Sequence, residues 1–210
     1  MTRRLAAALV AACLGVGCQN AAPDSPLDGP DGTAQDALDA CFVGDTDVGV
    51  ALVARRAARD DVDALTARAL CRWMAFARDS ARADAESALD DLDLAIRLAG
   101  ERPHETPLAH LHAHRAFVRQ ATDPGDWAAT LDDLDAAARL DPGSARHLLD
   151  RAFVRLGLAD TAAAMADLER VLLVDAADTA RVELARQTLA ELSGEPLSSF
   201  YRNQETVVFE

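Results

Sequence analysis

Three of the five histidines lie in the segment HLHAH, as His110, His112 and His114. His110 and His114 are four residues apart, which places both imidazoles on one face of a helix, an arrangement that helical zinc ligands use. No glutamate follows His110 directly, so the segment lacks the HExxH pattern of zinc peptidases. A metal site here would need a third ligand from elsewhere in the chain. The other interpretation, which we adopt, is a polar helix surface, and we assign no metal and no cofactor.

The chain contains no motif that is typical of an enzyme active site. It lacks the GxSxG nucleophile turn, the phosphate-binding P-loop and the GxGxxG dinucleotide motif. Aspartates recur in two DDLD segments, 90–93 and 132–135. Residues that recur with a structural repeat usually have a structural role. We therefore interpret these aspartates as parts of solvated helix faces and not as paired catalytic carboxylates. We therefore expect that the protein is not an enzyme.

Arginines recur in pairs, because the pentapeptide RAFVR occurs at 115–119 and again at 151–155. Two arginines four residues apart share a helix face, where they could grip a partner's carboxylates or form ion pairs with neighbouring aspartates. The phenylalanine between them faces either a partner or the core. Both interpretations stay open, and the candidate partner-binding residues are Arg115, Phe117, Arg119, Arg151, Phe153 and Arg155.

Cys41 and Cys71 form an even pair once the two cysteines near the N-terminus are set aside. In an oxidising compartment such a pair can form a disulfide; otherwise it remains as two buried thiols that pack like small apolar side chains. The spacing alone does not decide between these alternatives, since bonding depends on the separation of the Cα atoms. The chain has no CxxC motif, so neither a thioredoxin-like site nor a zinc ribbon is expected.

The N-terminal segment has the layout of a secretion signal. Two arginines precede a short apolar stretch that ends in small residues, and residues 1–17 are the expected signal peptide. The segment LGVGC, which ends at Cys18, resembles a bacterial lipobox, and that resemblance implies that Cys18 carries lipid. Cys13 is the alternative lipidation site, but it leaves a shorter apolar stretch. An ordinary signal peptide cleaved near Ala21 is the other alternative.

Residues 18–36 are rich in proline, glycine, aspartate and serine, which is typical of a flexible tether. The resemblance to lipoproteins then implies a bacterial envelope protein that is anchored to a membrane by palmitate and related acyl chains. Asn20 stands after the cysteine at the place where aspartate commonly retains lipoproteins in the inner membrane, and its identity favours the outer membrane, facing the periplasm.

The composition predicts a helical body. Hydrophobic residues make up 50% of the 210-residue chain, aromatic residues only 4%, and 46 residues are alanine. Alanine favours helices that pack closely, whereas strands are built from β-branched and aromatic residues. The formal net charge of −14 argues against nucleic acid as a partner.

An internal repeat organises this body. Besides the two RAFVR copies, which lie 36 residues apart, similar segments begin at Asp90, Asp132 and Ala166. Each copy predicts a pair of helices, and in the second helix small and large apolar residues recur at steps of four, three and three. These predicted buried faces are Ala88, Leu92, Ala95 and Leu98; Thr130, Leu134, Ala137 and Leu140; and Ala164, Leu168, Val171 and Val174.

This pattern resembles the tetratricopeptide repeat, whose helix pairs recur every 34 residues. The second-helix pattern of that family is met by Thr130, Leu134, Ala137 and Pro142, and Trp127 stands where the family has an aromatic residue after the turn. The small residue of the first helix corresponds to Ala116 and Ala152. The resemblance covers about residues 64–178, and it departs from the family pattern at Ala176, where proline is expected.

The resemblance implies an all-α, right-handed superhelical solenoid of antiparallel helix pairs over residues 37–194. We expect three full pairs, a helix at 47–59 before them that looks unpaired but leaves a fourth unit possible, a capping helix at 179–192 after them, and a separate tail at 195–210. It also implies an envelope scaffold or adaptor that binds an unidentified protein or peptide in a groove lined by first helices. The alternative function is a periplasmic protein that binds a metal or a small ligand through His110 and His114.

Overall fold

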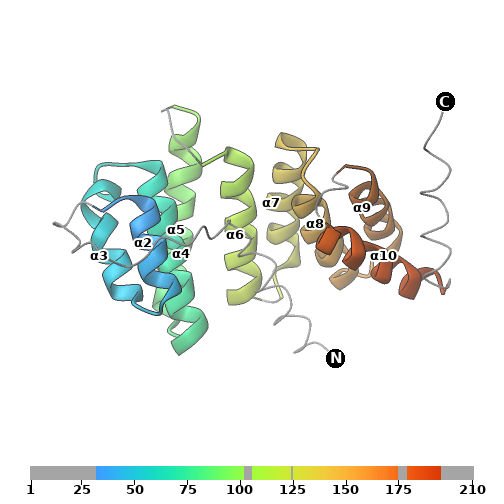
Figure 1. The fold of residues 1–210 in the computed structure, drawn as a ribbon, viewed down its shortest axis with the longest axis horizontal. Coiled ribbons are helices and arrows are strands. Elements are labelled where there is room, and N and C mark those ends of the chain that lie inside the picture. Colours follow the sequence, from blue (N-terminus) through green and yellow to red (C-terminus); the bar gives the residue numbers. More distant parts are fainter. Residues whose placement is uncertain (1–31, 102–105, 124, 175–178, 195–210) are drawn as a thin grey trace.

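The computed structural model describes residues 32–101, 106–123, 125–174 and 179–194, and all regular structure within these ranges is helical. Figure 1 shows the helices following one another along the long axis of the molecule, from α2 and α3 at one end to α9 and α10 at the other. Their bounds are α2 (Ala34–Phe42), α3 (Thr46–Ala57), α4 (Val62–Asp79), α5 (Arg82–Ala99), α6 (Leu108–Thr122), α7 (Trp127–Leu140), α8 (Ala145–Gly157), α9 (Thr161–Val174) and α10 (Thr179–Ser193).

Each helix packs mainly against its neighbours along the chain. The pairs are α2 with α3, α4 with α5, α6 with α7 and α8 with α9, while α10 packs on α9 and α8. Contacts between α5 and α6 and between α7 and α8 join one pair to the next. The described chain is therefore an all-α helical-repeat solenoid, as the sequence predicts.

One expectation is wrong, because the helix predicted at 47–59 is not unpaired. It is α3, and it packs against α2, which begins inside the segment expected to be a tether. Thr33 begins α2 with a capping box, in which its hydroxyl accepts from the backbone N–H of Asp36 and that carboxylate accepts from the N–H of Thr33. The polar composition of residues 18–36 as a whole conceals this local start signal.

Short polar side chains start four of the later helices. In α4, α7, α8 and α9, an oxygen of the residue before the helix accepts a hydrogen bond from a backbone N–H three residues further on. These residues are Asp61, Asp126, Ser144 and Asp160.

The predicted faces of the second helices are buried over their first three positions. Leu92 and Leu168 have no exposed surface, and Leu134 is 3% exposed. The fourth position, at the helix end, is more open, since Leu140 is 49% exposed. Alanines let the helices approach closely, and Ala116 and Ala152 are buried in the first helices as predicted.

A glycine provides one of these close approaches. A Cβ atom at Gly157, the last residue of α8, would lie 2.9 Å from the ring of Trp127 at the start of α7. Carbon atoms do not approach so closely without displacement, so this position requires the absence of a side chain. Trp127 thus packs directly on the backbone of the following pair.

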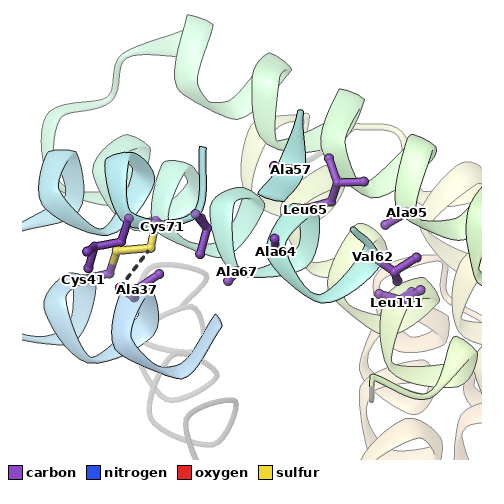
Figure 2. Packing of buried hydrophobic residues seen from close by; sticks show 12 residues of the cluster. Ala37, Cys41, Ala57, Val62, Ala64, Leu65, Ala67, Cys71, Ala95 and Leu111 are labelled. Carbon is purple, nitrogen blue, oxygen red and sulfur yellow. Dashed lines mark hydrogen bonds between the residues drawn. A yellow bond between two sulfur atoms is a disulfide. The ribbon is translucent and has the colours of Figure 1, made fainter. Parts of the chain in front are cut away.

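Cys41 of α2 and Cys71 of α4 form a disulfide, with their Cα atoms 5.5 Å apart (Figure 2). The bond links the first helix pair to the second. Gly49 of α3 lies against both sulfurs, and a Cβ there would come within 2.9 Å of Cys71 Sγ and closer still to Cys41 Sγ. Figure 2 also marks the approach of Cys71 Sγ to the carbonyl oxygen of Ala37, 3.4 Å away. Because a disulfide sulfur carries no proton, this approach is a close contact and not a hydrogen bond.

The expected signal peptide, Cys18 and the tail at 195–210 lie outside the described residues, as does the tether up to residue 31. Among the helices that are described, none has both the length and the apolar character needed to cross a bilayer.

Candidate functional site

A buried aspartate lies at the centre of each of three helix pairs. Each aspartate belongs to the second helix and accepts hydrogen bonds from two arginines, four residues apart, on the first helix. The three sets are Asp91 with Arg68 and Arg72, Asp133 with Arg115 and Arg119, and Asp167 with Arg151 and Arg155. We call these contacts the arginine–aspartate ladder.

The same geometry recurs at each level of the ladder. The second arginine places Nη1 2.7 Å from the carboxylate in all three cases. That nitrogen also reaches a backbone carbonyl oxygen four residues before the aspartate; for Arg119 the acceptor is Ala129, at 3.2 Å. The second arginine therefore binds both the aspartate side chain and the backbone of its partner helix, through charge-assisted hydrogen bonds from one nitrogen.

A second aspartate connects successive pairs. Arg115 Nη1 donates to Asp93 of the preceding pair at 2.7 Å, and Arg151 Nη1 donates to Asp135 at 2.8 Å. Asp93 and Asp135 remain 43% and 41% exposed. The four arginines that the sequence presents as partner-binding candidates are thus engaged within the protein, as the ion-pair interpretation expects.

The prediction that the DDLD segments are solvated helix faces is wrong for their second residue. Asp91 is 5% exposed and Asp133 is 2% exposed, whereas Asp90 and Asp132 face solvent. The physical reason is the pair of arginines on the facing helix, which compensates a charge that could not otherwise be buried. His112 adds to this compensation, since its Nδ1 lies 3.0 Å from Asp133 Oδ1.

In the set around Asp133, the electrostatics favour the ionised form of the aspartate and its arginine Arg115. Burial opposes the charge on Asp133, but hydrogen bonds from His112 and Arg115 outweigh it and hold the pKa of this carboxyl below its ordinary value. The hydrogen bond to Asp133 correspondingly raises the pKa of Arg115. Both shifts favour the charged form of the Arg115–Asp133 pair.

The two phenylalanines between the arginines are half-buried on the first helices. Phe117 contacts Trp73 of α4, with ring centroids 4.5 Å apart and planes tilted by 54°. Phe153 packs against the cluster that contains Leu168 and Leu189. Both rings thus border the core and keep part of their surface accessible.

A second group of ionisable side chains comes from α6, α8 and α10. Its members are His114, Arg146, Asp150 and Arg181. Burial lowers the pKa of His114 to about 3, and Arg146 and two nearby imidazoles act in the same direction. Burial raises the pKa of Asp150 to about 6, although Arg146 and Arg181 act in the opposite direction. Asp150 keeps 21% of its side-chain surface, and its carboxylate lies 3.9 Å from Arg146 Nε. Perturbed carboxyl and imidazole groups of this kind are concentrated at functional sites.

His110 does not form a site with His114 but meets two residues that the sequence analysis missed. The ligand atoms of His110, Asp141 and His147 all lie within 4.8 Å of one another, and His114 is not a member of this group. The rings of His110 and His147 make an edge contact at 5.4 Å. His147 is fully buried, and burial lowers its pKa to about 4. Only the junction of α6, α7 and α8 brings these residues together, so no local motif could have revealed them.

Searches against protein-family models and against curated proteins find no match to this chain. Among solved structures, the crystal structure of MamA matches with a TM-score of 0.56 and 15% identity, over 74% of this chain and 81% of that chain. A chain of the APC/C hetero-tetramer Cut9-Hcn1 matches with a TM-score of 0.57 and 17% identity, over 75% of this chain and 30% of that chain. Both neighbours are tetratricopeptide-repeat proteins, and the shared fold is a tetratricopeptide-like solenoid.

Proposed function

We propose that this protein is a non-catalytic interaction scaffold, which binds a protein or peptide partner through the first helices of its repeats. The observation that carries this proposal is that α6 and α8 each carry side chains of two kinds, some engaged inside the protein and others partly exposed. On each helix, two arginines are committed to the ladder inside the protein, while a phenylalanine between them remains partly accessible. The ladder fixes the frame, and the two phenylalanines present apolar surface at equivalent positions of successive repeats.

The chemistry of the first helices indicates what such a partner would offer. Phe117 and Phe153 supply partly exposed apolar surface, and Arg146 supplies a positive charge among side chains with perturbed pKa values. A partner segment with apolar anchors and an acidic side chain fits this combination. The likeness to tetratricopeptide-repeat solenoids supports an extended binding surface of this kind.

Site-specific photo-crosslinking tests the proposal. A photoreactive residue at position 153, on a first helix, is compared with one at position 173, where Leu173 on the second helix α9 is 83% exposed. We expect a discrete protein adduct from position 153 in the native cells and none from position 173. Adducts from neither position, or equally from both, would contradict binding through the first helices.

We further propose that the scaffold is held at the bacterial envelope by lipid on Cys18, after removal of residues 1–17, with the outer membrane as its site. The support is the lipobox-like sequence that ends at Cys18. Replacing Cys18→Ser should move the protein from the membrane fraction to the soluble fraction, whereas Cys13→Ser should leave it membrane-bound. The reverse pattern would assign the anchor to Cys13. Separation of inner and outer membranes by density then tests the location.

A further inference from the structure

The meeting point of α6, α7 and α8 carries a set of side chains that the scaffold role does not use. His110 lies in the first turn of α6, Asp141 is the residue that ends α7, and His147 lies in the first turn of α8. These helices are consecutive in the solenoid (Figure 1). Two imidazoles and one carboxylate are the ligand set of many zinc sites that keep an open coordination position.

His147 is the feature that the fold alone does not explain. Its side chain is fully buried, yet neither Nδ1 nor Nε2 has a hydrogen-bond partner among the described residues. Buried imidazoles are normally hydrogen-bonded or bound to metal, since an unsatisfied polar group in the interior is destabilising.

The other two residues have the freedom to complete a coordination shell. A tetrahedral zinc site has bonds of about 2.0–2.2 Å, so its ligand atoms lie about 3.3 Å apart. The three side chains already lie within 4.8 Å of one another. His110 and Asp141 are partly exposed and can rotate, whereas His147 is held by the surrounding core. Small rotations of the two surface residues toward the fixed imidazole would close the site.

We propose that His110, Asp141 and His147 bind a divalent transition-metal ion of the zinc type, at the junction of two helix pairs. The ion would link α6 to α8 and leave a fourth position for water or for a group of a binding partner. This site is independent of the proposed scaffold role, and it replaces the pairing of His110 with His114 that the sequence suggests.

Arg146 provides an internal check on this proposal. It precedes His147 directly in the chain, and its positive charge would repel a cation bound at that imidazole. Replacing Arg146→Gln removes this repulsion and leaves the three ligands in place. Metal affinity should therefore increase in this variant, whereas a site elsewhere in the chain would not respond.

The experiment is a zinc titration of the purified, tag-free full chain in competition with a chromophoric chelator, and a parallel titration with Co²⁺. We expect one equivalent of metal at micromolar concentration and a Co²⁺ absorption spectrum typical of four-coordinate sites. His110→Gln, Asp141→Asn and His147→Gln should each weaken binding by at least about tenfold, because loss of a ligand exceeds loss of an outer-shell contact. His114→Gln is the matched control, and its affinity should equal that of the unmodified chain.

Circular dichroism of each variant shows whether it folds. If His147→Gln does not fold, Asp141→Asn decides the question, because this residue lies in a partly exposed turn. Absence of zinc binding by the unmodified chain would overturn the proposal. Binding that survives Asp141→Asn but is lost in His114→Gln would also overturn it, since the ligands would then be the i, i+4 pair on α6.

Discussion

Arg115 Nη1 donates a hydrogen bond to Asp93 Oδ1 at 2.7 Å across the boundary between two helix pairs. The same guanidinium also binds Asp133 inside its own pair, so one side chain fixes both the pairing of α6 with α7 and the stacking of α6 on α5. Arg151 repeats this arrangement with Asp135 and Asp167. Stability in a solenoid is a sum of such internal and interfacial contributions, and here Arg115 and Arg151 each contribute to both.

The buried carboxylate of Asp133 should contribute strongly to the stability of the folded chain. In Asp133→Asn, the two arginines that surround this side chain lose their compensating charge in a largely buried position. We expect the free energy of unfolding to fall by about 3 kcal/mol, the usual consequence of removing one partner of a buried ion pair. Urea denaturation followed by circular dichroism measures the change.

The neighbouring residue supplies the control for this substitution. Asp132 lies on the same helix and faces solvent, so Asp132→Asn makes the same chemical change without affecting the ladder. Its effect should be within about 0.5 kcal/mol of zero. Equal effects of the two substitutions would show that the ladder contributes nothing beyond net charge.

The contacts between pairs should be weaker than the contacts within them. The side chain of Asp93 is 43% exposed, whereas that of Asp133 is 3% exposed, so solvent screens the first ion pair much more than the second. A double-mutant cycle on Arg115 and Asp93 should give a coupling energy of about 0.2–1 kcal/mol. The corresponding cycle on Arg119 and Asp133 should give more than about 1.5 kcal/mol. The reverse order would mean that stacking, and not pairing, depends on the ladder.

The helix pairs could be predicted from the sequence because their signals are local and periodic. The repeated RAFVR and the three-and-four spacing of Leu134 and Ala137 identify the helices and their buried faces, and the structure confirms both. The tetratricopeptide-like fold follows from that repetition. These features need only the geometry of one helix and the requirement to bury its apolar side.

The buried charges were missed because hydrophobic periodicity assigns every aspartate to the surface. The burial of Asp133 depends on two arginines of another helix, which the pattern within α7 does not contain. The contact of His110 with His147 is even harder to predict from the sequence, because it depends on how successive helix pairs stack. For the disulfide, the sequence supplied the candidate cysteines, but only the packing of α2 on α4 brings their Cα atoms to 5.5 Å.

Removing the disulfide should destabilise one end of the molecule selectively. Cys41→Ala combined with Cys71→Ala opens a link that spans 30 residues, for which we expect a loss of about 3 kcal/mol. Since each pair contacts only its neighbours, amide hydrogen exchange should accelerate in α2 and α3 and stay unchanged in α8 and α9. Reductant should have the same effect on the unmodified chain and none on the double variant. Uniform acceleration along the chain would contradict a local role.

Acid should destabilise the protein partly through His114. Its pKa is about 3 in the folded chain against an ordinary value of 6.5, so below pH 6.5 the unfolded chain takes up a proton that the folded chain excludes. The stability contributed by the neutral ring is complete above pH 6.5 and is lost as the pH falls. Between pH 7 and pH 5 this loss amounts to at most about 2 kcal/mol. His114→Leu removes the titrating group, so its free energy of unfolding should fall less over this interval.

Asp150 supplies a control of the opposite sign. Its pKa is raised to about 6, so the folded chain binds a proton more readily than the unfolded chain, and this carboxyl adds stability as the pH falls from about 6 toward 4. Asp150→Asn should therefore steepen the loss of stability on acidification, while His114→Leu makes it shallower. Urea denaturation at pH 7, 6 and 5 measures both slopes. If both variants followed the unmodified chain, acid destabilisation would arise outside this group, and the ladder carboxylates would be the groups to test next.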